Sequence, residues 1–286
     1  MSRRWYVLVA VMISALASGR GQSLEEVPLQ EIRGASQVFT QRAIVVKGQG
    51  VAPTDRPLNA GQKEIMALRA AKVVALRELA ETLAGVRVSG ETCVQDAAAR
   101  SDQVRATVDG LIKGAEVVQE NYDANKEMAT VYVRLSLDGP NGLTEALLPQ
   151  ILAEKAANVP PAPAFAPPPA PPSAPAADAL IIDATGKSFR PALVNRVVAK
   201  DGSVLFEPSK IAPEILAKKG CGDYTSDLGK AKAILASHGA KNPMVVTASG
   251  VVRSTDAQVS DGDAAKIFSA NQKGNFLEGA QVVFVL

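Results

Sequence analysis

A segment rich in proline and alanine, residues 157–177, divides the chain into two parts. It contains nine of the 18 prolines. Proline lacks a backbone N–H and restricts its neighbours, so such a segment is typical of an extended polyproline spacer that rises about 3.1 Å per residue. The sequence therefore predicts two folded domains, residues 38–156 and 178–286, joined by a semi-rigid linker.

Residues 1–17 have the pattern of a secretory signal peptide. Arg3 and Arg4 precede an apolar run that ends in the small residues Ala15 and Ala17 around Leu16. This run is shorter than the roughly 20 apolar residues needed to span a bilayer. Glycine follows at position 19, where a lipoprotein would carry its acylated cysteine. We therefore expect a periplasmic protein that does not insert directly into a membrane after signal cleavage.

Charge gives no indication of a nucleic-acid partner. The chain has 31 basic and 29 acidic residues, and removal of Arg3 and Arg4 would balance the two signs. Without a basic excess, binding to nucleic acid is not favoured. The longest predicted helix mixes both signs along one side, which is typical of a solvated face. These side chains are Arg69, Lys72, Arg77, Glu78 and Glu81.

The N-terminal domain alternates between strand and helix patterns. Its predicted elements are a strand at 41–49, a helix at 62–84, a strand at 86–94, a helix at 97–111, strands at 115–122 and 129–137, and a helix at 143–156. The helix at 62–84 has the clearest periodicity. Its predicted core face consists of Ile65, Leu68, Ala71, Leu76, Leu79 and Leu83. The order β-α-β-α-β-β predicts an α+β fold with helices on one face of a sheet.

The C-terminal domain also mixes the two patterns and is predicted to be a second small α+β domain. Asp201 and Gly202 form a two-residue hairpin turn between strands at 194–200 and 203–206. The other predicted elements are strands at 179–184, 244–253 and 281–286 and helices at 226–237 and 260–269. Because the last strand is apolar throughout, we expect it to be central and buried.

Motifs for cofactors and metals are incomplete. The pair Gly48 and Gly50 lacks the third glycine and the adjoining helix of a dinucleotide loop, so we interpret it as a turn at the strand exit. His238 has no second ligand nearby and is expected at a helix end. Asp261 and Asp263 form only half of a calcium loop, and Ser260 and Asp261 can cap the helix at 260–269, so we interpret Asp261 as a capping residue. We predict no cofactor-binding residue, no metal ligand and no cofactor.

Candidates for catalysis are equally sparse. Asp223 and Asp227 could be paired carboxylates, but turn and cap positions explain them without chemistry. Cys221 lies between two glycines and lacks a local base, so it is not expected to be a nucleophile. Cys93 and Cys221 fall in different domains, which favours independent thiols, with an interdomain disulfide as the alternative. We predict no catalytic residue.

Five short segments of the N-terminal domain follow one another in a familiar order. They are 46–53 (VKGQGVAP), 69–81 in the alanine-rich helix, 85–88 (GVRV), 110–118 with its KGAEVV, and 131–135 (VYVRL). Together they resemble the Lpp-twenty lipoprotein family, which includes FlgP and the amino-terminal domain of FlgT, flagellar components on the outer-membrane side of the envelope. The resemblance implies an α+β domain that assembles near an outer-membrane structure and has no catalytic residues. This chain departs from the family by lacking the lipobox cysteine.

These patterns lead us to expect a non-catalytic structural or assembly protein. The N-terminal domain would form homo-oligomer contacts at the flagellum or another outer-membrane structure, and the spacer would let the C-terminal domain reach a second partner. One alternative is that residues 178–286 bind an envelope polymer such as peptidoglycan or a polysaccharide. A hydrolase is a third hypothesis, and it requires Asp223, Asp227 and His238 to meet in a deep pocket.

Overall fold

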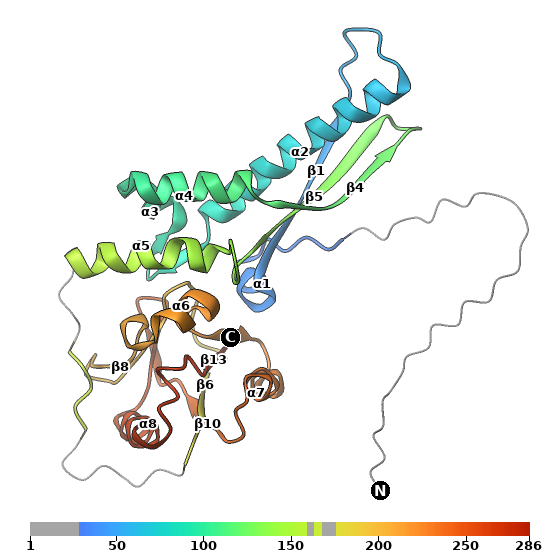
Figure 1. Ribbon diagram of the computed structural model, residues 1–286. Helices are drawn as coiled ribbons and strands as arrows, with labels where there is room; N and C mark the ends of the chain where they lie inside the picture. Colours follow the sequence, from blue (N-terminus) through green and yellow to red (C-terminus); the bar gives the residue numbers. More distant parts are fainter. Residues whose placement is uncertain (1–28, 159–162, 168–175) are drawn as a thin grey trace, which may run out of the picture.

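The computed structural model describes residues 29–158, 163–167 and 176–286 (Figure 1). The predicted signal peptide and most of the 157–177 segment lie outside the described residues. Both parts of the chain mix helices and strands, so the predicted α+β class is confirmed. None of the helices in the described ranges combines the length and the apolar character needed to cross a bilayer.

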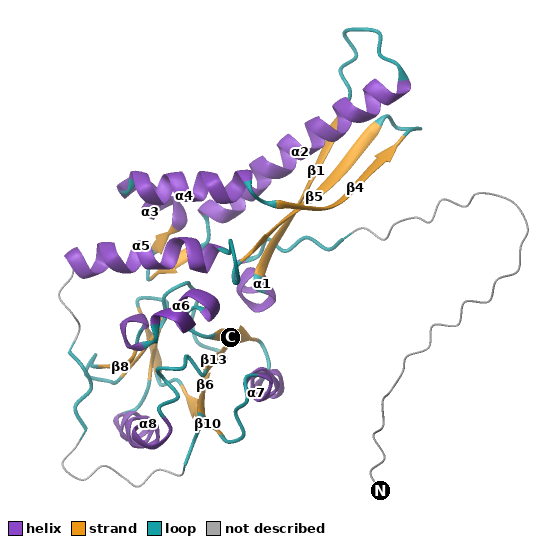
Figure 2. Ribbon diagram, in the orientation of Figure 1, coloured by secondary structure: helices purple, strands orange, loops and turns teal. Residues whose placement is uncertain are grey.

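The N-terminal domain is built on a three-stranded antiparallel sheet in the order β1-β5-β4. Its elements are α1 (Ala35–Gln41), β1 (Ala43–Val51), α2 (Ala60–Ala84), β2 (Arg87–Ser89), β3 (Thr92–Cys93), α3 (Val94–Arg100), α4 (Asp102–Lys113), β4 (Glu116–Asp123), β5 (Met128–Ser136) and α5 (Leu143–Asn158). The long helix α2 lies along one face of the sheet (Figure 2). The predicted hairpin between β4 and β5 is confirmed, and Asp123 closes its turn by accepting hydrogen bonds from the backbone of Asn125 and Lys126.

The glycine pair lies inside β1, so our interpretation of it as a strand-exit turn is wrong. A Cβ atom at Gly48 would lie 2.2 Å from the carbonyl oxygen of Ala71, and one at Gly50 would lie 2.3 Å from the Ala71 nitrogen. Only glycine permits this approach of strand to helix. On α2, fully buried alanines face the strand: Ala67, Ala71 and Ala75. This stripe replaces part of the predicted core face, and Ile65 is 52% exposed.

Two further N-terminal predictions are wrong in detail. Residues 86–94 form the separate hairpin β2-β3, because Gly90 has a φ of +55° and turns the chain back. That hairpin is no part of the main sheet. The predicted helix at 97–111 is two helices, because Ser101 has an extended backbone and caps α4 by accepting a hydrogen bond from the Val104 nitrogen (3.3 Å).

The C-terminal domain contains two four-stranded sheets, β10-β6-β13-β9, which is parallel, and β11-β12-β7-β8. Its elements are β6 (Ala179–Asp183), β7 (Arg196–Val198), β8 (Val204–Phe206), the 3₁₀ turn η1 (Pro208–Lys210), α6 (Pro213–Lys219), β9 (Asp223–Thr225), α7 (Leu228–Ser237), β10 (Pro243–Thr247), β11 (Gly250–Val252), β12 (Asp256–Gln258), α8 (Asp261–Gly274) and β13 (Val282–Val285). The final strand is central and buried, as predicted, and the Asp201-Gly202 hairpin joins β7 to β8.

The predicted strand at 244–253 is wrong, because the chain changes sheets in its middle. The Ala248 nitrogen donates a hydrogen bond to the Asp183 carbonyl in one sheet, and the next nitrogen, of Ser249, donates to the Gln258 carbonyl in the other (both 2.8 Å). Gly250 is therefore the first residue of a new strand, β11.

Part of the proline-rich segment is bound to the C-terminal domain. The Val204 nitrogen donates to the Pro163 carbonyl (2.9 Å), and the Phe165 nitrogen donates to the Val204 carbonyl (3.1 Å). The Phe165 ring lies 5.8 Å from that of Phe268 on α8. Residues 163–165 thus form a short parallel bridge to the edge strand β8, where the sequence led us to expect only a spacer.

Candidate functional site

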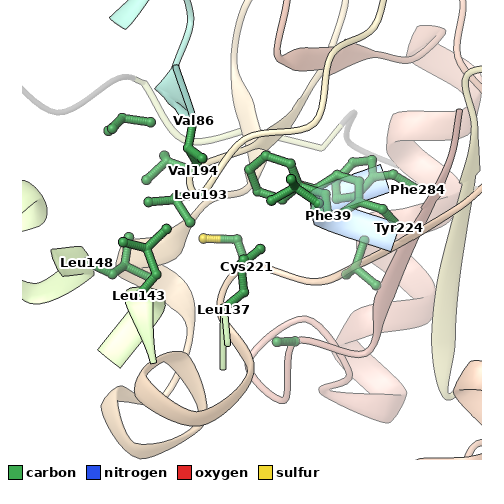
Figure 3. Packing of buried hydrophobic residues seen from close by; sticks show 14 of the residues in the cluster. Phe39, Val86, Leu137, Leu143, Leu148, Leu193, Val194, Cys221, Tyr224 and Phe284 are labelled. Carbon is green, nitrogen blue, oxygen red and sulfur yellow. The ribbon is translucent and has the colours of Figure 1, made fainter. Parts of the chain in front are cut away.

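The two domains meet through a continuous apolar core, which we call the joint. Phe39 of α1 packs edge-on against Tyr224 of β9, with ring centroids 5.3 Å apart, and Tyr224 stacks on Phe284 of β13 at 5.6 Å. Figure 3 shows that Leu143 of α5 and Cys221 lie in the same packing. The domains therefore share one core, and the separation that the linker led us to expect is not what the structure shows.

Arg42 is the central polar residue of the joint. It follows α1 with a φ of 54°, and this left-handed backbone turns the chain from the helix into β1. Its guanidinium donates to the carboxylate of Asp138, to the Lys219 carbonyl (2.8 Å) and to the Gly222 carbonyl (3.2 Å). One side chain of the N-terminal domain thus satisfies two backbone carbonyls of the C-terminal domain.

Two carboxylates of the joint, those of Asp138 and Asp223, lie beside the guanidinium of Arg42. Burial opposes the charged form of Arg42, but the carboxylates of Asp138 and Asp223 outweigh burial and raise its pKa. Burial raises the pKa of Asp138, even though Arg42 and the Thr144 hydroxyl favour its charged form. Burial likewise raises the pKa of Tyr224 far above its ordinary value of 10.0. A base needs a group that can take up a proton near neutral pH, and neither the tyrosine nor the paired arginine offers one.

The hairpin β2-β3 makes a second polar contact across the joint. The Leu193 nitrogen donates to the Arg87 carbonyl (3.0 Å), and the Val194 nitrogen donates to the Val88 carbonyl (2.8 Å). Through these two bonds the backbone of β2 is joined to the C-terminal domain. In the described part of its own domain, β2 pairs only with β3 and not with the sheet β1-β5-β4.

The tip of the same hairpin is held by side chains. The Gly90 nitrogen donates to the Thr255 hydroxyl (2.8 Å), and the Ser254 hydroxyl donates to the Glu91 carboxylate (2.7 Å). The bond from Ser254 lowers the pKa of Glu91 below its ordinary value of 4.5. The hairpin and Arg42 therefore fasten the domains at two separate places.

The three residues required by the hydrolase hypothesis have different roles. The Asp223 carboxylate lies 3.6 Å from Nδ1 of His238, which is the C-cap of α7 at the predicted helix end. Asp227 is the N-cap of the same helix and accepts a hydrogen bond from the Lys230 nitrogen (2.8 Å). The cavity beside Arg42 has a volume of about 10 Å³, roughly the space of one water. This cavity is thus too small for a substrate.

The metal and thiol candidates also have local structural roles. Of the two predicted capping residues, Ser260 caps α8 by accepting a hydrogen bond from the Asp263 nitrogen (3.1 Å), and Asp261 is the first residue of the helix. Over the described part of the chain, no group of three His, Cys, Asp or Glu residues could hold a metal ion. Cys93 and Cys221 form no disulfide. The Cys93 thiol donates to the Asp96 carboxylate (3.0 Å), and Cys221 is buried in the joint.

A wider pocket of about 310 Å³ opens between α1 and the end of α2. Its apolar lining comes from Val38, Phe39 and Val86, and its charged groups are Arg33 and Glu81. These charged groups are both solvent-accessible, and the Arg33 guanidinium pairs with the carboxylate of Glu78, which is not part of the pocket lining.

Sequence reasoning missed Arg42, the residue that organises the joint. Its partners lie 96, 177 and 180 positions away, so no local pattern links them. The charged groups of the joint lie close to one another only because α1 and β9 pack together in the folded chain. The sequence predicts a strand at 41–49 and no helix before it, so the turn at Arg42 is not expected either.

The comparisons with known proteins concern the C-terminal domain. Residues 179–286 match the model of a protein family described as Treponema pallidum Tp0624, second domain. The match begins with the first residue of β6 and runs to Leu286. No curated protein matches the chain.

Proposed function

We propose that this protein is a non-catalytic structural or assembly component of the periplasm, in which the N-terminal domain makes contacts between copies at an outer-membrane structure such as the flagellum. The observation that carries this proposal is the shape of the N-terminal domain. The strands β1, β5 and β4 with the helix α2, which we call the arm, project away from the joint (Figure 1).

The surface of the arm supports a role in association. Seven large hydrophobic residues are exposed in the described part of the chain, and four of them belong to the arm. These four are Val51, Ile65, Val73 and Val74. Three of the four lie on α2 and the fourth lies on β1. Single exposed apolar side chains need no explanation, but a projecting element that carries several of them is a candidate for contact with another protein.

The joint supports the same role by holding the arm in place. Its aromatic core, the Arg42 contacts and the β2 pairing fix the arm relative to the C-terminal domain. A catalytic site needs accessible reactive groups, but the ionisable groups of the joint are used to connect the two domains. We infer that the protein acts by positioning surfaces and not by chemistry.

Light scattering on the mature chain, residues 18–286, tests the proposal. We expect species larger than a monomer at tens of micromolar, and we expect Val73→Asp to reduce their fraction because an exposed valine tolerates the charge without unfolding the arm. Ala236→Asp, on the exposed side of α7, is the matched control and should not affect assembly. A strict monomer for the unmodified chain would count against the proposal. Cell fractionation, with the mass of the mature N-terminus, tests the periplasmic location.

A further inference from the structure

The sheet of the arm has an open and acidic edge at β4. Within the described residues, no strand pairs with its outer side. The strand carries three acidic residues and no basic one: Glu116, Glu120 and Asp123. Like charges on directly opposed strands are unfavourable, so this edge is poorly suited to pair with a second β4. It is better suited to a strand that is basic or neutral.

The opposite edge of the sheet is open in its distal half. Val45 exchanges both of its backbone hydrogen bonds with Ile32, and the Lys47 nitrogen donates to the Glu31 carboxylate (3.1 Å). Because a side chain takes the place of a carbonyl at Lys47, strand pairing along this edge ends there in the described residues. The remaining part, residues 47–51, has one basic residue and no acidic one.

The helix α2 is displaced towards this second edge. It lies mainly against β1 and β5 and only slightly against β4. The Ala70 side chain lies over β1, since a Cβ atom at Gly50 would be 2.7 Å from it. Met66 and Val74 are four residues on either side of Ala70 and share its flank of the helix. Two apolar side chains of β4 remain only half-buried under the helix layer: Val117 and Tyr122.

We propose that copies of this chain join head to tail, with β4 of one copy pairing with residues 47–51 of the next. This inference rests on the proposed function and names the surface that carries it. The acidic edge then meets Lys47, and the apolar flank of α2 covers the half-buried side chains of the neighbouring β4. Each added copy presents the same open β4 again, so the contact repeats and builds a ring or a filament.

The register within one copy provides a sharp test. Gln49 and Asn121 both lie opposite Thr130, so they are at the same level on the two outer strands. Within one copy β5 separates them by about 10 Å, two strand spacings, which is too far for a disulfide. Across the proposed contact, β4 and β1 run parallel and these two positions become neighbours. A disulfide between them can therefore form only between copies.

The experiment is oxidative cross-linking of the mature full chain that carries Gln49→Cys and Asn121→Cys, with Cys93→Ser in every variant. We expect a ladder of dimers, trimers and higher species on a non-reducing gel, and almost only monomer for each single variant. To allow for a shifted register, the first cysteine is also placed at Lys47 and at Val51. The exposed pair Gln103→Cys and Lys230→Cys measures random collision.

The outcomes separate this inference from the proposed function. Assembly by light scattering, without a ladder above the collision control in any of the three registers, overturns the head-to-tail contact but leaves the structural role. A strong covalent dimer from Asn121→Cys alone overturns it in favour of a two-fold β4 contact. A monomer without a ladder overturns both.

Discussion

The arm and the joint hold their layers together in opposite ways. In the arm, Gly48 and Gly50 face a stripe of alanines, so a strand and a helix approach each other almost backbone to backbone. In the joint, the rings of Phe39, Tyr224 and Phe284 fill the space between two domains. Small residues bring two layers close but bury little apolar area, whereas rings bury much area and tolerate adjustment.

This difference has consequences for what each region can do. The thin arm leaves apolar side chains such as Val73 exposed, and in the described residues neither the outer side of β4 nor the outer side of β1 at residues 47–51 has a strand partner. The joint instead pairs the guanidinium of Arg42 with groups of both domains. The arm is therefore the part suited to new contacts, and the joint is the part suited to fixing its direction.

The largest expected effect is on the close packing of the arm. Gly48→Val places a side chain within 2.2 Å of the Ala71 carbonyl, where backbone and not a movable side chain must yield. Overpacking of this kind should lower the free energy of unfolding by at least about 3 kcal/mol in urea denaturation. Gly110→Ala is the control, because no atom lies within 4 Å of its Cβ position and alanine favours helix. Equal stabilities for the two variants would show that the arm is not closely packed.

The second prediction concerns the joint. Arg42→Met removes the three hydrogen-bonded contacts and leaves Asp138 partly buried without its cation. Breaking such a pair should cost about 2–4 kcal/mol, below the range for a fully buried pair because both side chains are 24% exposed. Urea unfolding should then separate into two transitions, one for each domain. Asp138→Asn in addition should recover part of the loss, and a single unchanged transition would contradict a stabilising joint.

Parts of this fold could be predicted from the sequence because their signals are local. The Asp201-Gly202 turn, the β4-β5 hairpin and the apolar strand β13 all follow from neighbouring residues. The periodicity of α2 gave a correct helix but a partly wrong face. The periodicity assigned large apolar residues to the core. Because Gly48 lies so close to α2, only alanine fits on the helix face that contacts β1, and Ile65 is exposed.

The joint could not be predicted, because its contacts connect distant parts of the chain. The proline-rich composition of 157–177 indicated separation, yet Phe165 packs on Phe268 and its backbone pairs with Val204. Nothing in the sequence around Arg42 or Arg87 shows that their partners belong to the other domain. Composition describes how a segment behaves alone, and tertiary packing overrides it here.

The third prediction concerns residues 163–167 and tests whether side-chain packing holds this segment in place, as it does the joint. Phe165→Ala removes a half-buried ring beside Phe268 while leaving the backbone pairing with Val204 possible. Because the ring is only partly covered, the loss should be about 1–2 kcal/mol, less than for a fully buried phenylalanine. Limited proteolysis should cut near residues 163–167 faster in the variant. Pro167→Ala, at an exposed neighbouring position, is the control and should be cut at the original rate.

The smallest effect is expected at the tip of the β2-β3 hairpin and depends on pH. The hydrogen bond from Ser254 keeps the pKa of Glu91 below 4.5, so the folded state binds protons less readily than the unfolded state. The contribution of Glu91 to stability is therefore complete above pH 4.5 and is lost as the pH falls through its folded pKa. Ser254→Ala should raise that pKa towards 4.5, as measured by NMR titration of the Glu91 carboxyl group, and should flatten the acid limb of the stability curve. A Glu91 pKa that stays the same in Ser254→Ala would mean that the hairpin tip is held by the bond between Gly90 and Thr255 and not by this carboxylate.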